Sequence, residues 1–557
     1  MKNNMQRLRQ WASKGRHLIW LEYSALALFI LFPLLPFGYI LTLDLVFTPH
    51  AAWPQQITNT YPLQAILWAL QNILPGDVVE KLVLFSILLL SGVGAHLLVS
   101  SLRVEKKLRT FWGVVAYFAG ILYMINPFTY SRFMAGQWMV LLGYALLPFF
   151  VGSSVAFLRD PSWKRGLAAG LWSALLLTMS LHHAGMLVVV ALWVLVAGVW
   201  LYRQDSRVLK RFVGGLALAG GAFTILSGYW LIPALLGCGT IGKSIASFDN
   251  AHFMAFATNG SGSLGALGEV VRLQGFWAEA QNLFALPQAL VPAWGILFLA
   301  VWLLVVFGGI KAWRTHRLII SLGCVLIGAG VVVSATPFLQ WVGGFIPFVN
   351  GYREPHKFVN LVALGYILLG AFGVAYFLEW VWRKRREVAV RVATVACLCL
   401  PLVLTPTMFW GFSGQLAPRA YPLEWESMNQ RIKQEIPDGK RVLFLPWHQY
   451  AIYSFSGSRI IANPAQKFFE APTIVSDEPE FRDVPPTVPN DEKRRISVAL
   501  RQPESLRRLL VDLNVEYIIL ANEQDAKKYE YLDRLDGIRL VDTNEKLKLY
   551  RVEDSNG

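Results

Sequence analysis

An acidic side chain lies where the first long apolar run of the chain ends. The segment Gly38–His50 reads GYILTLDLVFTPH, and Asp44 is its one carboxylate. A carboxylate at the mouth of a membrane helix is costly to keep unless it is solvated, paired or used. Asp44 could therefore act as a general base toward a hydroxyl substrate, or it could merely mark the water interface.

Two cations stand together much later in the chain, where Gly351–Phe358 reads GYREPHKF. Arg353 and Lys357 are four residues apart, so they share one face if a helix begins this early. A helix N-terminus with two cations suits a phosphate group. The alternative is that Arg353 pairs with Glu354 or Asp44 as a structural bridge.

The composition is that of a polytopic membrane protein. Of 557 residues, 55% are apolar and 16% are charged, and the mean hydropathy is +0.44, whereas ordinary soluble domains carry about 25% charged residues. The net charge of +15 falls in short basic clusters between apolar runs. This pattern is typical of topology signals rather than of a nucleic-acid-binding face, so no nucleic-acid partner is expected.

The apolar runs predict eleven membrane-spanning helices. Their approximate ranges are 18–43, 79–102, 111–126, 138–158, a hairpin of two spans around 180–183, 212–236, 289–309, a ninth span ending before 334, 358–380 and 392–410. Every predicted inner connection carries at least three Lys or Arg residues, and the outer ones are sparse. We therefore expect a multi-pass protein of the cytoplasmic membrane, with its N-terminus in the cytoplasm and everything after residue 410 outside.

This topology gathers titratable groups at the outer membrane face. They are Asp44, His50, Arg132, His182, His183, Lys243, Asp249, His252, Glu269, Arg272, Arg353, Glu354, His356 and Lys357. Long irregular loops accompany them, and non-helical backbone at membrane depth is tolerated only where it is buried in protein or lines a cavity. The pattern indicates a lipid-facing active site.

The remainder of the chain has a different character and predicts a small extracytoplasmic α/β domain over 412–557, after a membrane domain over 1–411. Strands are expected at 441–445, 517–520 and 548–552, helices at 424–435 and 503–513, and a long surface loop at 472–490. Trp447 and His448 lie in a Pro-Trp-His-Gln-Tyr stretch. They are candidates for stacking on an acceptor sugar, although core packing accounts for them equally well.

Metal chemistry has a weak signal. Asp249 and His252 are three residues apart in a long outer loop and could be a metal pair or simply polar loop residues. A divalent ion such as Mg or Mn is therefore a possible cofactor. Walker, GxSxG, HExxH and CxxC motifs are absent from the sequence, so soluble NTPase, hydrolase and zincin functions have no support.

Three patches together, Asp44–His50, Asn126–Trp138 and Arg353–Lys357, resemble the membrane core of GT-C glycosyltransferases. The resemblance is to bacterial arabinofuranosyltransferases of the AftD kind and, more loosely, to YfhO-like membrane proteins. It implies a transferase that takes a sugar from a polyprenyl-phosphate donor at the outer membrane face. In such enzymes an acidic residue of the first outer loop acts as the base, and here that position is Asp44. The first outer loop holds no Asp-Asp or Glu-Asp pair, and the chain lacks long carbohydrate-binding extensions.

An inverting transfer of this kind needs a base for the acceptor hydroxyl and cations for the departing phosphate. We expect Asp44 to be the base and Arg353, Lys357 and Arg132 to hold the phosphate. The possible assisting residues are His50, His182, His183, Glu354 and His356. The acceptor would be a glycan, a lipid or a protein.

Two other classes of function compete with this one. A flippase or transporter for a lipid-linked sugar predicts internal repeats and ionisable residues near the bilayer midplane, whereas here the polar residues lie at the rim. A non-catalytic assembly protein predicts that Asp44→Asn changes no glycan.

Overall fold

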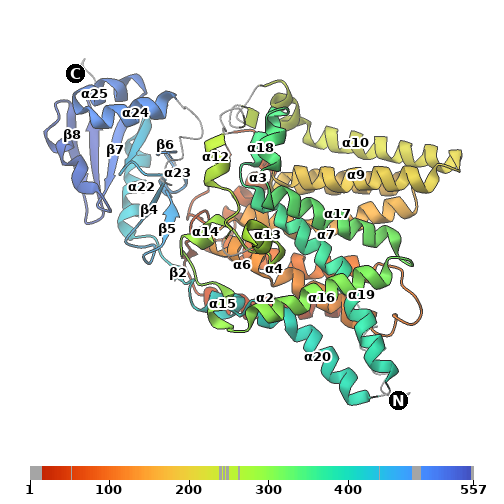
Figure 1. Ribbon diagram of the computed structural model, residues 1–557. Helices are drawn as coiled ribbons and strands as arrows, with labels where there is room; N and C mark the ends of the chain where they lie inside the picture. The colour runs from red at the N-terminus through yellow and green to blue at the C-terminus, as the bar shows by residue number, and fades with distance from the viewer. Residues whose placement is uncertain are drawn as a thin grey trace.

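The computed structural model describes residues 16–51, 53–54, 56–237, 241–242, 245, 250–260, 264–384, 386–437, 439–478 and 491–553. Figure 1 shows two parts, a large helical bundle and a smaller α/β domain, drawn in blue, at one end of the bundle. This confirms the predicted class, a polytopic helical membrane protein with a C-terminal α/β domain.

Within the described residues, ten helical segments are long and apolar enough to cross a membrane. The helices of these segments are α2 (Arg16–Leu31), α4 (Gly76–Ser100), α5 (Trp112–Met124), α7 (Trp138–Arg159), α9 (His183–Tyr202), α10 (Ser206–Leu235), α16 (Trp294–Ala312), α17 (Arg317–Ala335), α19 (Val359–Arg383) and α20 (Glu387–Leu404). The segment of α5 continues to Met134, because α5 alone has 13 residues. Helix α8 (Trp163–Met179) occupies the place of the fifth predicted span and packs against α7 and α10. Its 17 residues are at the lower limit of about 17–25 residues for a spanning helix.

Helix α19 forms the centre of the bundle. Of the most apolar 18-residue stretch in the segment Pro355–Arg383, which contains this helix, 94% is buried. Helix α19 packs against α16, α17 and α5. Gly308 of α16 and Gly373 of α19 allow this approach, because a Cβ on Gly308 would lie 2.0 Å from the Leu369 carbonyl oxygen. Without a hydrophobic force between helices in lipid, such close backbone contact is a main source of association.

Short elements cover the end of the bundle that faces the α/β domain. They are α3 (Tyr61–Gln71), α6 (Pro127–Met134), α12 (Asn250–Ala255), α13 (Gly265–Val271), α14 (Trp277–Ala280), α15 (Pro287–Leu290), α18 (Phe338–Gly343), and the 3-10 turns η2 (Pro347–Tyr352) and η3 (Pro355–Phe358). The connections α9–α10, α16–α17 and α19–α20, which carry the basic clusters, lie at the opposite end (Figure 1).

The described part of the α/β domain contains a five-stranded sheet in the order β6-β3-β7-β9-β8. Its strands are β3 (Arg441–Leu445), β6 (Thr473–Ile474), β7 (Val515–Ala521), β8 (Ile538–Thr543) and β9 (Leu547–Val552). Strands β6, β3 and β7 are parallel, and β9 runs antiparallel to both of its neighbours. The predicted strands and helices are therefore confirmed, except that β6 begins inside the expected loop 472–490, of which 479–490 lies outside the described residues.

Alternate residues of β3 pack against different layers, as the two-residue period of a strand requires. Val442 and Phe444 pack with α22 (Leu423–Glu435), and Leu443 and Leu445 pack with α24 (Asp491–Arg501) and α25 (Pro503–Asp512). The sheet is thus covered on both faces.

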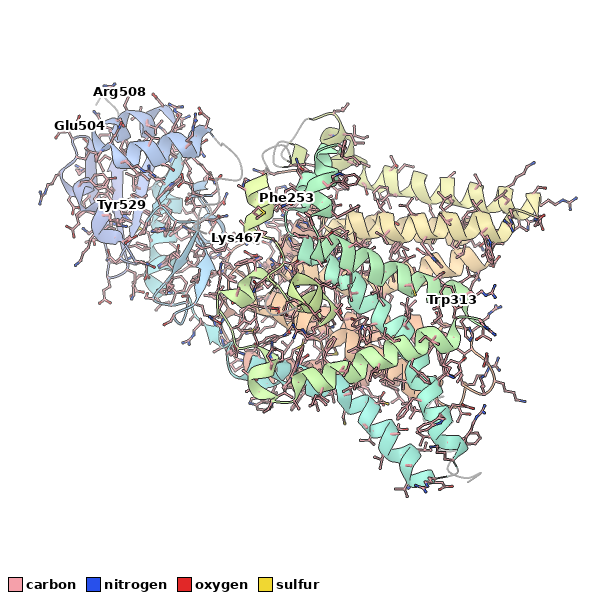
Figure 2. All side chains as sticks on the ribbon, in the orientation of Figure 1. Phe253, Trp313, Lys467, Glu504, Arg508 and Tyr529 are labelled. Atoms are coloured by element: carbon pink, nitrogen blue, oxygen red, sulfur yellow. The ribbon has the colours of Figure 1, made fainter. Side chains whose placement is uncertain are left out.

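The domain is joined to the bundle through the segment that carries Asp44. Strand β1 (Tyr39–Ile40) pairs with β2 (Pro418–Arg419), and Leu43 exchanges backbone hydrogen bonds with Ile460 and Ala462 at 3.0 and 2.8 Å. Lys467, labelled in Figure 2 on the side of the domain toward the bundle, donates to the Val46 carbonyl at 3.2 Å. The first outer loop is therefore held between the two parts.

Candidate active site

A cavity of about 650 Å³ lies at the junction of the bundle and the α/β domain. Its polar lining includes Asp44, Thr58, Gln137, His182, Arg353, Glu354, Lys357, Gln449 and Tyr450. Its apolar lining includes Leu181, Ala184, Trp230, Leu231, Ala234, Leu235, Ile241 and Ile245, from the turn before α9, from α9 and α10, and from the chain after α10. Leu235 is 63% exposed, so the apolar wall continues to the lipid-facing surface of α10.

The backbone around Asp44 is fixed by the end of α6 and the residues that follow it. The Asp44 amide donates to the Ala135 carbonyl at 3.2 Å, and Thr42 Oγ1 donates to the Met134 carbonyl at 2.7 Å. Gly136, at φ +67°, permits this contact, because a Cβ there would lie 2.2 Å from the Leu45 nitrogen. The Gly136-Gln-Trp motif thus holds the loop that presents the carboxylate.

The side chain of Asp44 accepts a 2.7 Å hydrogen bond from the Tyr450 hydroxyl at Oδ1. Burial raises the pKa of Asp44 above its ordinary value, and the Tyr450 hydrogen bond and the charge of Lys357 oppose this rise. Burial and the neighbouring carboxylate raise the pKa of Tyr450 as well, so the phenol remains a donor. The result is a carboxylate of increased basicity that faces the cavity.

Glu354 lies between two cations. Its side chain pairs with Arg132 and, at 2.9 Å, with Lys357 Nζ. Burial would raise the pKa of Glu354, but the charges of Arg132 and Lys357 hold it well below its usual range. Lys357 also donates to His182 Nε2 at 2.8 Å, and burial together with the Lys357 charge keeps the pKa of His182 well below its ordinary value. His182 is therefore a neutral acceptor that orients the ammonium group.

Arg132 is fully buried, with 0% of its surface exposed, and does not line the cavity. It lies on α6, which begins at Pro127 after Asn126 caps the Thr129 amide at 3.0 Å. Besides Glu354, it donates to Gln137 Oε1 at 2.5 Å and to His356 Nδ1 at 2.6 Å. Arg132 thus positions the Glu354 carboxylate from behind the cavity wall.

Arg353 lines the cavity, and its guanidinium lies 5.0 Å from the ring centre of Phe256. Burial lowers the pKa of Arg353, and the nearby carboxylates of Glu354 and Asp44 oppose this. The expectation that Arg353 and Lys357 share one α-helix face is wrong. Pro355 keeps Glu354 out of the helical region at φ −108° and ψ 82°, so the two cations extend from separate short turns and converge on the cavity through the loop.

The other histidines predicted to assist lie outside the cavity lining. His356 is buried between Arg132 and the Gln274 carbonyl, to which its Nε2 donates at 2.9 Å. His183 is buried at the start of α9, 3.4 Å from the Asn360 amide nitrogen. His50 pairs with Glu426 of α22 at 3.1 Å.

Trp447 and His448 also lie away from the cavity. The Trp447 indole donates to Ser497 Oγ at 2.9 Å, and its backbone amide donates to the Tyr529 hydroxyl at 3.0 Å. His448 lies 3.4 Å from Asp525. The next two residues in the chain, Gln449 and Tyr450, line the cavity instead, so acceptor binding by Trp447 and His448 stays a prediction.

Metal binding also stays a prediction. Asp249 lies outside the described residues, and His252 is buried. Among the described residues, no group of three or more His, Cys, Asp or Glu side chains could hold a metal ion. A Mg or Mn ion is therefore assigned no residues here.

The sequence analysis did not identify three polar residues of the site. Tyr450 and Gln449 line the cavity, and Lys467 lies close enough for its charge to lower the pKa of Asp44. Tyr450 follows the Trp447-His448 pair directly in the stretch already quoted, and Gln137 was part of the Gly-Gln-Trp motif. Lys467 carried no local signal, since it is one of many lysines in the α/β domain.

No protein-family model matches the chain, and no curated protein matches it in sequence. Among solved structures, the arabinofuranosyltransferase AftD from Mycobacteria matches with a TM-score of 0.59 at 15% identity, over 98% of this chain and 40% of that one. A mutant form of AftD matches with a TM-score of 0.58 at 15% identity, over 97% and 42%. The archaeal oligosaccharyltransferase AglB from Archaeoglobus fulgidus has a TM-score of 0.47 at 9% identity, over 90% and 69%. The chain spans 40% of the length of AftD and shares the fold of that part of AftD, which confirms the predicted resemblance at the level of the fold.

Proposed function

We propose that this protein is a membrane glycosyltransferase that moves a sugar from a polyprenyl-phosphate donor to a hydroxyl acceptor. The observation that carries the proposal is the cavity itself, in which Asp44 of the first outer loop and Arg353 and Lys357 before α19 line one space. The likeness to AftD, an arabinofuranosyltransferase, supports it at the level of the fold. The sugar and the acceptor are assigned only by these chemical classes.

The two kinds of cavity lining suit the two parts of such a donor. The apolar wall formed by Leu231, Ala234 and Leu235 of α10 can hold isoprenoid carbons, since it continues to the exposed surface of that helix. Arg353 and Lys357 can hold the phosphate, because a cation placed where charge develops stabilises a leaving group strongly in a site of low dielectric. The Glu354 pair with Lys357 fixes the ammonium before the donor arrives.

The reaction follows from the position of Asp44. The acceptor oxygen forms a bond to the anomeric carbon as the bond from that carbon to the phosphate oxygen breaks. Asp44 takes the proton of the acceptor hydroxyl, and the polyprenyl phosphate leaves against Arg353 and Lys357. The raised pKa of Asp44 improves it as a base near neutral pH. Among the described lining residues the carboxylates are Asp44 and Glu354, and Glu354 is held in ion pairs, which favours direct displacement with inversion.

The orientation in the membrane completes the proposal. The basic helix connections lie at the end of the bundle remote from the α/β domain (Figure 1), and basic loops remain in the cytoplasm. We therefore assign the α/β domain and the cavity to the outer face of the cytoplasmic membrane, where the acceptor would be a glycan or glycolipid.

Purified protein incubated with radiolabelled polyprenyl-phosphate sugars and mixed glycan acceptors tests the proposal. Asp44→Asn is expected to lower turnover by about 10²–10⁴-fold, the usual contribution of a general base. Asp536→Asn, a matched change at an exposed aspartate of the α/β domain, should leave turnover unchanged. Full turnover by Asp44→Asn would falsify the role of this residue, and transbilayer movement of the lipid without sugar transfer would instead indicate a flippase.

A further inference from the structure

Two adjoining hollows lie at the basic end of the bundle, far from the active-site cavity. They measure about 430 and 330 Å³ and share Arg103, Val155 and Arg159 in their linings. They form where the C-terminal ends of α4, α7 and α9 meet the α16–α17 connection. Each volume lies within the range of about 300–1,000 Å³ that is common for small-molecule sites.

The linings of these hollows are strongly cationic. The charged side chains among their described lining residues are Arg103, Arg159, Asp160, Arg165, Arg314 and Arg317. These are five arginines and one aspartate, with a formal net charge of +4. The aspartate is already paired with Arg165 at 3.0 Å.

The remaining arginines have no acidic partner among the described residues, since Glu105, which contacts Thr315 of the lining, is paired with Lys107 at 2.8 Å. Arg103, Arg314 and Arg317 make no ion pair with a described carboxylate, and Arg159 donates to the Ser101 carbonyl at 3.2 Å. Basic residues that serve only as topology signals can lie anywhere in a connecting loop. Here four of them, from three separate connections, converge on shared hollows, which is favourable only if an anion or solvent offsets their repulsion.

Apolar and aromatic side chains complete both linings. Leu97, Pro148 and Phe149 line the larger hollow, and Trp193 and Trp200 line the smaller one. Trp200 is 53% exposed, and Trp313, at the same end of the bundle in Figure 2, is 49% exposed. Tryptophan side chains at such positions lie at the headgroup level of a bilayer.

We propose that these hollows bind the phosphate headgroup of an anionic phospholipid in the leaflet at the basic end of the bundle. Arg103 and Arg159 would contact the phosphate from the shared wall, with Arg314 and Arg317 opposite. The apolar side chains would contact the first carbons of the acyl chains. Basic pockets between membrane helices are suited to headgroups of this charge. The inference is independent of the proposed transferase activity.

Native mass spectrometry of the full chain, reconstituted in vesicles of phosphatidylcholine and phosphatidylglycerol, tests it. We expect retained lipid to be enriched in phosphatidylglycerol, and Arg103→Gln/Arg314→Gln to weaken this retention by about thirtyfold, since each basic residue near an anionic surface contributes a factor of about five. The matched control, Arg207→Gln/Arg211→Gln, removes two exposed arginines at the start of α10, outside both hollows, and should retain the lipid.

Three results would overturn the proposal. The first is equal retention of the two lipids by the unaltered protein. The second is equal loss of phosphatidylglycerol in the control pair, which would mean that the overall positive charge rather than the hollows attracts lipid. The third is displacement of the lipid by millimolar inorganic phosphate, which would assign the hollows to a free anion. Unchanged thermal unfolding of both double variants verifies that they are folded.

Discussion

The hydroxyl of Tyr450 donates a 2.7 Å hydrogen bond to Oδ1 of Asp44, although the two residues are 406 positions apart. One belongs to strand β4 (Tyr450–Ile452) of the α/β domain and the other to the first outer loop of the membrane bundle. The candidate base therefore requires the docked domain for its orientation, which gives the α/β domain a direct part in the proposed chemistry.

Tyr450→Phe should move the pH profile of turnover. The hydrogen bond lowers the pKa of Asp44, whereas burial raises it. Without the bond, the pKa of Asp44 rises further and the carboxylate is protonated at higher pH. We expect the acidic limb of kcat/KM against pH to shift upward by about one unit or more, given about 1.5–3 kcal/mol for a bond to a charged group.

Tyr531→Phe is the control for this change, because its hydroxyl contacts only the Leu500 carbonyl at 3.4 Å among its described partners. An acidic limb that stays in place in Tyr450→Phe, or moves equally in both variants, would show that Tyr450 does not tune the base.

Arg353→Gln should act mainly on the chemical step. The guanidinium lines the cavity and can stabilise charge on the departing phosphate, and removing one such donor costs about 10²–10³-fold in kcat. Arg353→Lys should recover only part of the rate, because an ammonium lacks the bidentate geometry. Kinetics with a fixed acceptor measure both, with exposed Arg508→Gln as the control (Figure 2). A rise in KM with unchanged kcat would mean that Arg353 contributes only to binding.

The membrane part of the fold could be predicted from the sequence because its rules are local. Membrane spans follow from runs of apolar residues, and the direction of each span follows from the basic loops. The predicted hairpin at Ser180–His183 therefore agrees with the structure, in which α8 ends at Met179 and α9 begins at His183. The short apolar run of Arg441–Leu445 likewise predicted β3, whose last four residues are buried.

The pairings within the site could not be predicted, because they depend on tertiary approach. Arg132 pairs with Glu354 although 222 residues separate them. The local sequence around Glu354 does not show whether its buried partner is Arg132 or the adjacent Arg353. The prediction for Trp447 had the same weakness. An aromatic residue beside a histidine has the same local sequence whether it contacts a ligand or, as the Trp447 indole does, a serine of its own domain, Ser497.

Glu354→Gln should destabilise the protein. It would leave the fully buried Arg132 without its carboxylate, and breaking one side of a buried ion pair costs about 3–5 kcal/mol. Arg132→Met/Glu354→Gln should unfold at a higher temperature than Glu354→Gln alone, because it removes the orphaned charge. Thermal unfolding in detergent measures both. Equal destabilisation of the single and double variants would contradict the pairing as the cause.

The same carboxylate sets a pH dependence of stability. Because the folded-state pKa of Glu354 is depressed, its contribution is present above the ordinary glutamate pKa of about 4.3 and is lost only as pH falls below it. The stability gap between the unaltered protein and Glu354→Gln should therefore be constant from about pH 6 to 8 and shrink under acidic conditions. A gap that widens as pH falls would have the wrong sign for a depressed carboxyl pKa.

Gly136→Ala should displace Asp44 without touching the cavity. The new Cβ would lie 2.2 Å from the Leu45 nitrogen and 2.4 Å from the Thr42 carbonyl oxygen, both backbone atoms of the first outer loop, and φ at Gly136 is +67°. We expect a loss of about 1–2 kcal/mol from the left-handed conformation alone, and a fall in turnover of about a hundredfold, since a misplacement of about 1 Å has that effect on a positioned group. Gly214→Ala is the matched control: nothing lies within 4 Å of a Cβ at this position of α10, and alanine is the better helix former. Unfolding temperatures and turnover measured together separate the two effects, and an active, less stable Gly136→Ala would mean that the loop can move without displacing the base.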